Sequence, residues 1–438
     1  MAAFTLAAVF ITACEHNVDP EPDPEVESKI DFGDPKEDEY NAFHIADIII
    51  STDKGKEIVS KDEYIGCSIK IDGKGAFADY EGTAKIRGRG NSTWLWYPKK
   101  PYKLKLDSGS PLLGMAKNKT WVLLANYRDV THLMNNIGFT LAHCLDIPYA
   151  NHTRYVRLTL NGVEKGLYVL TEQVKEGDNS VKLDATEGIL LALDVNDGPD
   201  DCPDATDNFW SQVYRSACCI KYPEDATAAE VAWVKPAFAE LEKAIESKDW
   251  DRTSGILDVE SMINYILAQE IMGNVEMNNG NSIRSGYINR YDSGSKWIMG
   301  PVWDCDGGFS YDWSDMYDSR GLGHTYFKNY KYLVFGTDPY LQEGAYGPFP
   351  QFFSDLFAIP EFVEAFKERW EDVHEGLLDY LLASIDSTEE LIASSAEKDL
   401  SLWKIRYTHS NEVNKLKAWL VNRFDYLGTV IPNYPQRD

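Results

Sequence analysis

The first half of the chain carries short apolar runs separated by polar residues. Between about His44 and Asp194 these runs are rich in β-branched and aromatic residues and end at Gly, Asn, Asp or Pro. Such runs are typical of strands. The clearest read IADIIIST, YIGCSIKI, TAKIRGRG, YKLKLD and WVLLAN. Two more alternating runs flank Asn161-Gly162, a dipeptide that predicts a tight β-hairpin. This part of the chain is therefore expected to be strand-rich.

From about Glu224 onward the apolar residues follow the spacing of helices. Three stripes recur every three or four residues. They are Val231, Val234, Phe238, Leu241, Ile245; Phe362, Phe366, Trp370, Val373, Leu377; and Val413, Leu416, Leu420, Phe424, Leu427. Pro236 is expected to kink or split the first helix. The segment 311–353 lacks periodicity and is expected to be a long surface excursion. Strands followed by helices predict an α+β chain, with a cleft between two lobes.

The amino terminus has the features of an export signal. Residues 1–13 are apolar and uncharged, and they end at Cys14. This run is too short to span the roughly 30 Å of a bilayer core as a helix, but it has the length of a signal-peptide apolar region. Ile11-Thr12-Ala13-Cys14 resembles a bacterial lipobox, although no Lys or Arg precedes it. We expect a signal peptide over 1–13 and lipidation of Cys14.

The residues after Cys14 predict a tether and then a folded part. Residues 14–43 are rich in Asp, Glu and Pro, and such a stiff, charged segment has nothing to bury. An acidic stretch after a lipidated cysteine resembles the surface-export signal of Bacteroidetes lipoproteins. We therefore expect an outer-membrane lipoprotein of a Gram-negative bacterium, at the cell surface or in the periplasm, that contacts the membrane through its lipid alone. The folded domain is expected over 44–435, with lobes of about 44–200 and 201–435.

The charge of the chain limits its partners. Lys+Arg number 43 and Asp+Glu 70, which gives a net charge of −27. An excess of this sign argues against binding to nucleic acid or to an anionic lipid surface. It leaves cations, neutral ligands and basic proteins as partners. Cys202 could form a disulfide with Cys218 or Cys219 in an oxidising compartment, and the sequence leaves this open.

A basic block is the first candidate for chemistry. The runs KIRGRGNS (85–92) and PKKPYKLKL (98–106) predict two strands joined by a Gly- and Asn-rich turn. On the second strand Tyr102, Leu104 and Leu106 face one way, and Lys103 and Lys105 face the other. Positive charge beside glycine amides suits a polyphosphate. The simpler alternative is a hairpin with lysines on its solvent face.

Two acidic segments form the other candidates. An apolar strand ends at Asp304-Cys305-Asp306-Gly307-Gly308, which delivers two carboxylates on a turn, as Mg²⁺ or Ca²⁺ requires. A helix over 261–272 is expected to stop at Gly273. The loop that follows offers oxygen atoms that suit a general base or a metal ligand. Its polar residues are Glu276, Asn278, Asn279 and Asn281. Both segments are also compatible with ordinary turns and caps.

The order of these motifs resembles the CotH kinase family, named for a bacterial spore-coat protein kinase. The matching blocks are KIRGRGNST with PKKPYKLKLD, LLGMAKNKTWVLLANYRDVTHLMNN, GVEKGLYVLTEQV, QEIMGNVE and PVWDCDGGF, followed by a helix that ends near Arg423. The resemblance runs from about residue 45 to 430. It implies a divergent, protein-kinase-like, two-lobed fold that transfers the γ-phosphate of ATP to Ser or Thr of another protein in trans, with Mg²⁺, Mn²⁺ or Ca²⁺.

The resemblance also implies roles for individual residues. Asp306 matches the family's metal-binding, catalytic Asp, and Asp304 shares the metal with Asn281. Lys103 or Lys105 neutralises the α- and β-phosphates, while Arg87 and Asn91 line the nucleotide. Glu172 pairs with that lysine. Phosphoryl transfer consists mainly of positioning and charge neutralisation, so these few groups would be sufficient.

One departure from the family pattern bears on the activity. The family usually has Gly-Asn-x-Asp after the helix, and its Asp is expected to be the catalytic base. This chain has Gly273-Asn274-Val275-Glu276. The extra methylene of Glu276 shifts its carboxylate by about an ångström, a misplacement that can cost roughly a hundredfold in rate. A weakened enzyme or a nucleotide-binding pseudokinase is therefore compatible with the sequence.

Two other classes of protein also fit the composition. Twelve Trp, 25 Tyr and paired carboxylates suit a surface glycan-binding protein or a glycosidase. A structural adhesin or assembly factor without catalysis is the third reading. The Lys/Arg cluster distinguishes these classes from a kinase, because a neutral glycan does not require it.

Overall fold

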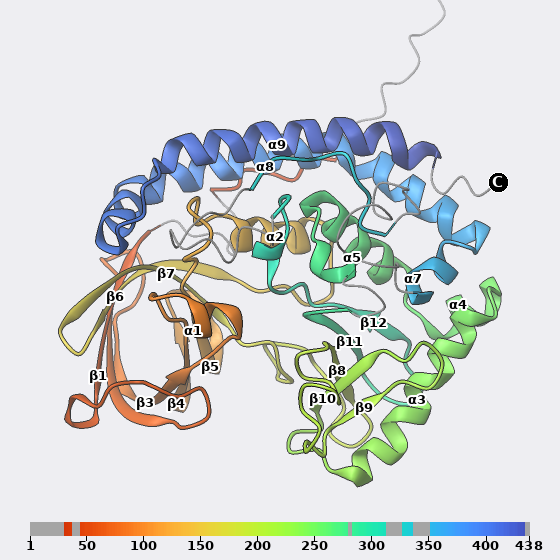
Figure 1. Ribbon diagram of the computed structural model, residues 1–438, viewed down its shortest axis with the longest axis horizontal. Coiled ribbons are helices and arrows are strands. Elements are labelled where there is room, and N and C mark those ends of the chain that lie inside the picture. The colour runs from red at the N-terminus through yellow and green to blue at the C-terminus, as the bar shows by residue number, and fades with distance from the viewer. Residues whose placement is uncertain (1–29, 37–43, 279–282, 312–325, 336–350, 434–438) are drawn as a thin grey trace, which may run out of the picture.

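Seven strands of the first half close into a barrel, as the computed structural model shows (Figure 1). The structure describes residues 30–36, 44–278, 283–311, 326–335 and 351–433. The predictions for Cys14, for 1–13, for most of the linker and for Asn281 lie outside these residues. The barrel order is β1-β2-β3-β4-β5-β7-β6, and parallel pairing of β1 with β6 closes it. Its strands are β1 (Ala46–Thr52), β2 (Ile65–Asp72), β3 (Tyr80–Gly88), β4 (Tyr102–Leu112), β5 (Met115–Leu124), β6 (Thr153–Leu160) and β7 (Val163–Glu172).

Alternation along these strands explains why the barrel has a dry interior. Inward positions carry large apolar side chains that are fully buried, among them Ile48, Leu104, Trp121 and Leu158. Each of the five predicted runs is a strand of this barrel, and Asn161-Gly162 forms the turn between β6 and β7 with φ of 51° and 75°. The predicted strands and hairpin are therefore confirmed. The closure of the strands into a barrel was not predicted.

A second sheet lies beside the barrel and carries the middle of the chain (Figure 1). Its five strands run in the order β12-β11-β8-β10-β9. They are β8 (Ile189–Leu193), β9 (Asn208–Trp210), β10 (Ala217–Tyr222), β11 (Gly286–Arg290) and β12 (Trp297–Met299). The central strand β8 is buried at every position, because strands pair on both of its edges and helices cover the sheet.

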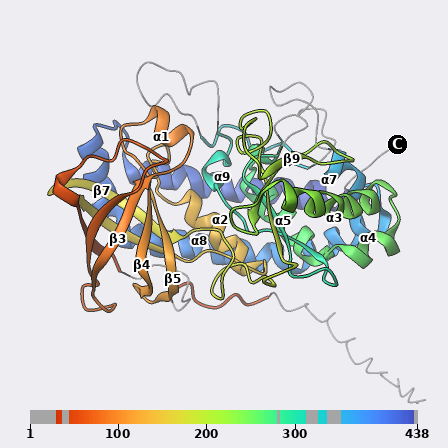
Figure 2. The same cartoon turned by 90° about the horizontal axis from the view of Figure 1, so that it is seen from below.

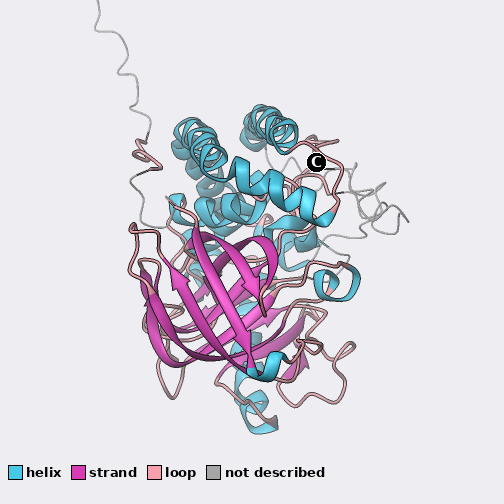
Figure 3. Ribbon diagram, turned by 90° about the vertical axis from the view of Figure 1, so that its left-hand side faces the viewer, coloured by secondary structure: helices cyan, strands magenta, loops and turns pink. Residues whose placement is uncertain are grey.

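The two longest helices lie over both sheets, and shorter helices lie beneath them and beside the sheets (Figures 1 and 3). The helices are α1 (Ser92–Trp96), α2 (Met134–Cys144), α3 (Ala228–Glu246), α4 (Trp250–Ile256), α5 (Val259–Met272), α7 (Gln351–Leu356), α8 (Pro360–Trp403) and α9 (His409–Val430). Short 3-10 turns are η1 (Asp53–Gly55), η2 (Val275–Asn278), η3 (Cys305–Gly307) and η5 (Ile431–Asn433). Helices α8 and α9 pack against each other and run along the molecule from the barrel to the far helices (Figure 2). None of the described helices has the length and apolar character needed to cross a membrane.

Two expectations about the helical part need correction. Pro236 does not split helix α3, which is continuous over Ala228–Glu246. Pro236 and Ala232 lie on the exposed side, so water can satisfy the Ala232 carbonyl that loses its helical donor. Residues 332–335, within the expected surface excursion, are buried in the core instead. The Glu270 carboxylate accepts hydrogen bonds from the backbone amides of Val334 and Phe335 at 2.9 and 2.8 Å, and this fixes the segment inside.

A buried ion pair joins the barrel to the long helix α8. Lys99 Nζ lies 2.9 Å from Asp399 Oδ1, and the two side chains are 0% and 1% exposed. Lys99 also donates to the Leu167 carbonyl at 2.5 Å, and Leu167 N donates to Asp399 at 2.8 Å. Gly166 makes room, because a Cβ there would lie 1.9 Å from Asp399 Oδ1. His132 Nε2 approaches the same carboxylate at 3.4 Å. A β-strand, a loop and a helix therefore meet on one carboxylate.

Removal of Lys99 should destabilise the protein strongly. Lys99→Met leaves Asp399 buried without its cation, and breaking one partner of a buried pair costs about 3–5 kcal/mol. We expect this loss in the free energy of unfolding measured by urea denaturation. The control is Lys417→Met, whose partner Asp386 is 58% exposed, and exposed pairs contribute about 0–1 kcal/mol. Equal losses in the two variants would contradict the role of the Lys99–Asp399 pair.

Candidate functional site

A cleft of about 940 Å³ lies between the barrel, the second sheet and the loops that follow α5 and β12. Residues predicted from three separate segments line it together. They are Arg87, Asn91, Lys103, Lys105, Glu276 and Asp304. The cleft thus combines a cationic wall from the barrel with carboxylates from the helical part, and the fold, not the sequence order, brings the two together.

The cationic wall consists of like charges placed directly opposite one another. Arg87 on β3 pairs across the strands with Lys103 on β4, and Lys85 pairs with Lys105. Opposed like charges destabilise a sheet unless an anion lies between them. Among the described residues, no carboxylate lies within ion-pair distance of Arg87 or Lys103. Burial and the neighbouring cations lower the pKa of Lys103 to about 8. The wall is therefore preorganised for an added anion.

Arg89 extends this wall and was not singled out from the sequence, although it belongs to the KIRGRG run. Its guanidinium lies over the Trp303 ring, 5.5 Å from the centroid, and faces the Asp-x-Asp turn. Burial lowers the pKa of Arg89, and the nearby Asp304 carboxylate opposes that shift. Lys221 and Arg284 also line the cleft and were likewise missed, because nothing in their local sequence connects them to the motifs.

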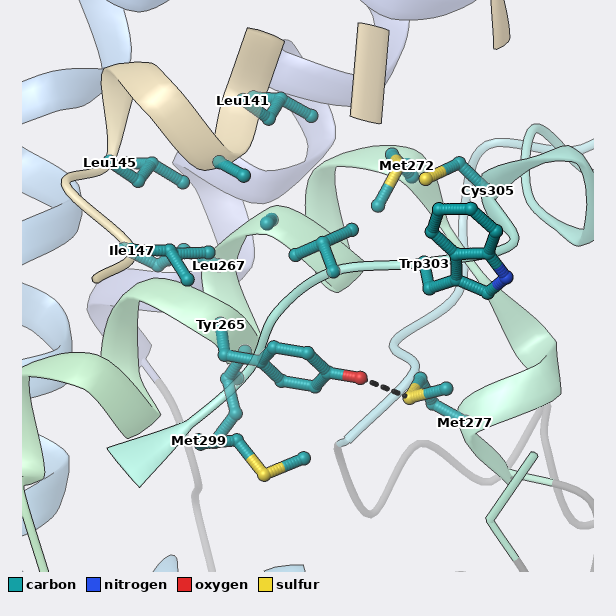
Figure 4. Close-up of a cluster of buried hydrophobic side chains, with 14 of the residues drawn as sticks. Leu141, Leu145, Ile147, Tyr265, Leu267, Met272, Met277, Met299, Trp303 and Cys305 are labelled. Atoms are coloured by element: carbon teal, nitrogen blue, oxygen red, sulfur yellow. Dashed lines mark hydrogen bonds between the residues drawn. The ribbon is translucent and has the colours of Figure 1, made fainter. Parts of the chain in front are cut away.

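The Asp-x-Asp turn is anchored by the side chains that alternate with its carboxylates. Trp303 and Cys305 are buried beside Met272 in the core beneath the cleft (Figure 4). Gly138 of α2 leaves space for this turn, since a Cβ there would lie 2.0 Å from Cys305 Sγ. The Cys305 amide donates to Asn135 Oδ1 at 3.0 Å. Cys305 is therefore fixed in the core, while Trp303 and Asp304 line the cleft.

The carboxylates of the site are crowded, with Glu276 and Asp306 buried and Asp304 half-buried. Asp304 accepts a hydrogen bond from Ser285 Oγ at 3.2 Å, and Asp306 Oδ2 lies 3.2 Å from Arg128 Nη2. Burial and the charge of Asp306 raise the pKa of Asp304 to about 6. Burial and the charge of Asp304 raise the pKa of Glu276 well above its usual range. These carboxylates therefore repel one another, and additional positive charge would stabilise their ionised forms.

Glu276 is held against the turn by a close backbone contact. A Cβ on Gly307 would lie 2.6 Å from Glu276 Cγ and 2.7 Å from its Oε1. Gly273 ends α5 in the left-handed conformation, with φ of 57°, as expected from the sequence. This stop turns the chain into η2, which carries Glu276 to the cleft. The position of the candidate base thus depends on two glycines.

The two carboxylates present suit a divalent cation whose remaining ligands are water molecules or the phosphates of a nucleotide. Among the described residues, no group of three or more His, Cys, Asp or Glu side chains is arranged to hold a metal ion. Asp304 and Asp306 supply two carboxylates, and Mg²⁺ in phosphoryl-transfer sites is held by one or two carboxylates plus substrate phosphates. The residues present fit that mode, in which the nucleotide completes the coordination.

Glu172 does not make the predicted contact with Lys103 or Lys105. Glu172 is buried and accepts hydrogen bonds from His152 N and Nδ1, each at 2.9 Å. It pairs across the strands with Trp121, whereas Lys103 pairs with Val122. Side chains alternate along a strand, so Glu172 lies on the opposite face from both lysines. The next residue, Gln173, lines the cleft in its place.

The remaining predicted residues lie at the rim. Asn91 Oδ1 accepts a hydrogen bond from Lys61 Nζ at 3.0 Å, and Lys105 is exposed. The cysteines of the described residues are free thiols, including Cys202, Cys218 and Cys219. Cys219 Sγ instead lies 3.2 Å from Lys221 Nζ at the cleft wall.

Comparison with known proteins identifies the class. A family model described as CotH kinase protein matches residues 86–427. The chain therefore belongs to the CotH kinase family, a family of kinase-like proteins, and the resemblance drawn from the motifs is confirmed. Among solved structures, the Helicobacter pylori proinflammatory kinase CtkA is similar, with 10% identity and a TM-score of 0.25 over 68% of this chain and 94% of that chain. No curated protein matches the chain.

Anion binding in the cleft should weaken as the pH rises through about 8. Lys103, whose pKa is lowered to about 8, is charged below that pH and neutral above it. Tripolyphosphate affinity, measured by calorimetry between pH 6 and 10, should fall by about tenfold over this window. A loss of this size is expected when one charge-assisted contact disappears. In Lys103→Arg the charge persists across this range, so the fall should disappear. An unchanged pH profile in that variant would exclude Lys103 as the titrating group.

Proposed function

We propose that this protein is an ATP-dependent protein kinase that transfers the γ-phosphate to Ser or Thr of another protein, and that it turns over slowly. The observation that carries the proposal is the single cleft in which the Arg87–Lys103 wall meets the carboxylates of Asp304 and Glu276. Membership of the CotH kinase family supports it. In this reading the barrel and the helical part are the two lobes of a divergent kinase.

Each wall of the cleft would perform one part of phosphoryl transfer. Arg87, Arg89 and Lys103 bind and neutralise the nucleotide phosphates, while Lys105 and Asn91 lie further out along the same surface. Asp304 and Asp306 hold Mg²⁺ or Mn²⁺, which when bound offsets the charge of the phosphates. A neutral glycan would leave the opposed cations of β3 and β4 unpaired, which is why a kinase is favoured over the glycan-binding alternative.

Glu276 is the proposed general base, and its length explains a slow reaction. It carries one methylene more than the family's usual aspartate, which displaces its carboxylate by about an ångström. This displacement lowers the rate without preventing nucleotide binding. Burial and Asp304 raise the pKa of Glu276 in the metal-free protein, and a bound divalent cation would oppose that rise. We infer a weak enzyme from the displaced carboxylate.

We further propose that the acceptor is a protein of the cell envelope or surface. The support is the sequence of the amino terminus, with an apolar run before Cys14 and an acidic segment after it. Lipidation of Cys14 would hold the kinase at the outer membrane, so that its lipid alone contacts the bilayer. Protein partners are expected to act as substrates in trans, with no role for nucleic acid.

The proposed activity is tested by transfer of radiolabelled γ-phosphate to a mixed envelope-protein fraction, with Mg²⁺ or Mn²⁺ present. We expect slow labelling by the wild type and its loss in Asp306→Ala. Labelling that is equal in both proteins would contradict the metal-binding role of Asp306. A parallel thermal-unfolding screen should show stabilisation by ATP with Mg²⁺ and none by neutral oligosaccharides, and the reverse pattern would favour a glycan-binding protein.

Gly307→Ala should uncouple catalysis from nucleotide binding. Its new Cβ would displace the Glu276 side chain, and a displacement of about 1 Å can cost roughly a hundredfold in rate. We expect labelling to fall by about that factor while stabilisation by ATP with Mg²⁺ is retained. The matched control is Gly428→Ala in α9, where a Cβ meets no atom within 4 Å. Unchanged labelling in Gly307→Ala would argue against Glu276 as the base.

A further inference from the structure

One buried cation of the cleft, Arg128, belongs to the LLGMAKNKTWVLLANYRDVTHLMNN block but has no role in the function proposed above. Arg128 lies in the loop between β5 and α2, with 4% of its surface exposed. Its Nη2 lies 3.2 Å from Asp306 Oδ2. Its guanidinium is stacked over the Tyr311 ring, 4.6 Å from the centroid. Arg128 also lines the cleft. It therefore contacts the candidate metal ligand directly and can be reached from the cleft.

The surroundings of Arg128 fix it in this position. The Tyr326 hydroxyl donates to the Asp306 carbonyl at 3.3 Å, and Tyr311 and Tyr326 pack together with ring centroids 5.1 Å apart. The 3.2 Å contact with the Asp306 carboxylate offsets the cost of burying the Arg128 guanidinium. Arg128 thus offsets the charge of the buried Asp306 carboxylate in the absence of a metal.

We propose that Arg128 is a built-in counter-ion of the Asp306 carboxylate and that it competes with the divalent cation for this ligand. The proposal rests on the proposed function in one respect, that Asp306 is a metal ligand. A guanidinium and a divalent cation repel each other, so both cannot be close to the same buried carboxylate without a cost. Arg128 is in this sense a positioning residue, which keeps the metal-free cluster folded and lowers its affinity for a cation that arrives without nucleotide.

This role differs from a purely structural one in a measurable way. If Arg128 only supports Tyr311 and Tyr326, its removal should loosen the site and weaken metal binding. If it competes with the metal, its removal should strengthen metal binding while it lowers the stability of the metal-free protein. The sign of the change in metal affinity therefore distinguishes the two roles.

The test is calorimetric titration of the nucleotide-free protein with Mn²⁺ alone. We expect Arg128→Met to bind Mn²⁺ about tenfold or more tightly than the wild type, because one unit of nearby positive charge is removed. Arg128→Lys, which retains the charge, should bind close to the wild type. The matched control is Arg154→Met, which removes a buried arginine that donates to the Leu113 and Thr153 carbonyls in the barrel. It should leave Mn²⁺ binding unchanged.

One further variant shows which carboxylate is responsible for the gain in Mn²⁺ affinity. A second replaces Arg128→Met if that variant does not fold. The double variant Arg128→Met/Asp306→Ala should not show the gain in Mn²⁺ affinity, because the carboxylate for which Arg128 competes has been removed. If Arg128→Met does not fold, Arg128→Gln keeps a polar side chain without charge, and Mn²⁺ should raise its melting temperature by more than it raises that of the wild type. Unchanged or weaker Mn²⁺ binding in the neutral variants would overturn the competition. That failure would leave the labelling test of Asp306→Ala unaffected, so the two proposals can fail separately.

Discussion

The buried contact between Lys99 and Asp399 is the interaction on which the cleft depends. Lys99 lies just before β4, the strand that carries Lys103 and Lys105, and Asp399 lies in the last turns of α8. Both charges are removed from water, so the pair is tolerated only because His132, the Leu167 backbone and each other satisfy them. The pair fixes one end of the basic strand against the helical layer.

A second buried pair performs the corresponding task on the opposite wall. Arg423 of α9 lies 3.0 Å from Glu270 of α5, and it also donates to the backbone carbonyls of Tyr330 and Tyr332. Helix α5 leads directly into Gly273 and Glu276. The segment 326–335, whose carbonyls bind Arg423, brings Tyr326 to the Asp306 turn. Each wall of the cleft is thus attached to the long helical pair α8 and α9 by one buried ion pair.

The overall charge of the chain gives little indication of what this site binds. A net charge of −27 describes the whole chain, including its acidic amino-terminal segment, whereas Arg87, Arg89 and Lys103 form a local cationic wall. Coulomb interactions in a partly buried cleft are far less screened than those at the surface. The local arrangement therefore decides the ligand. Arg128 extends the same principle to the acidic wall, because a single buried cation changes what a cluster of carboxylates can hold.

Local patterns in the sequence determined much of the secondary structure and many of the residues that line the site. Alternating apolar residues predicted the barrel strands, Asn161-Gly162 predicted the hairpin, and Gly273 predicted the end of α5. Each of these features depends on neighbours along the chain. The ordered motifs also determined the family. Only the tertiary structure decided the closure of the barrel, the burial of residues 332–335, and the face on which Glu172 lies, because these depend on partners distant in sequence and on the register between strands. The meeting of Arg128 with Asp306, 178 residues further along the chain, is of the same kind. The sequence identified the charged groups, and the packing of the fold determined which of them meet.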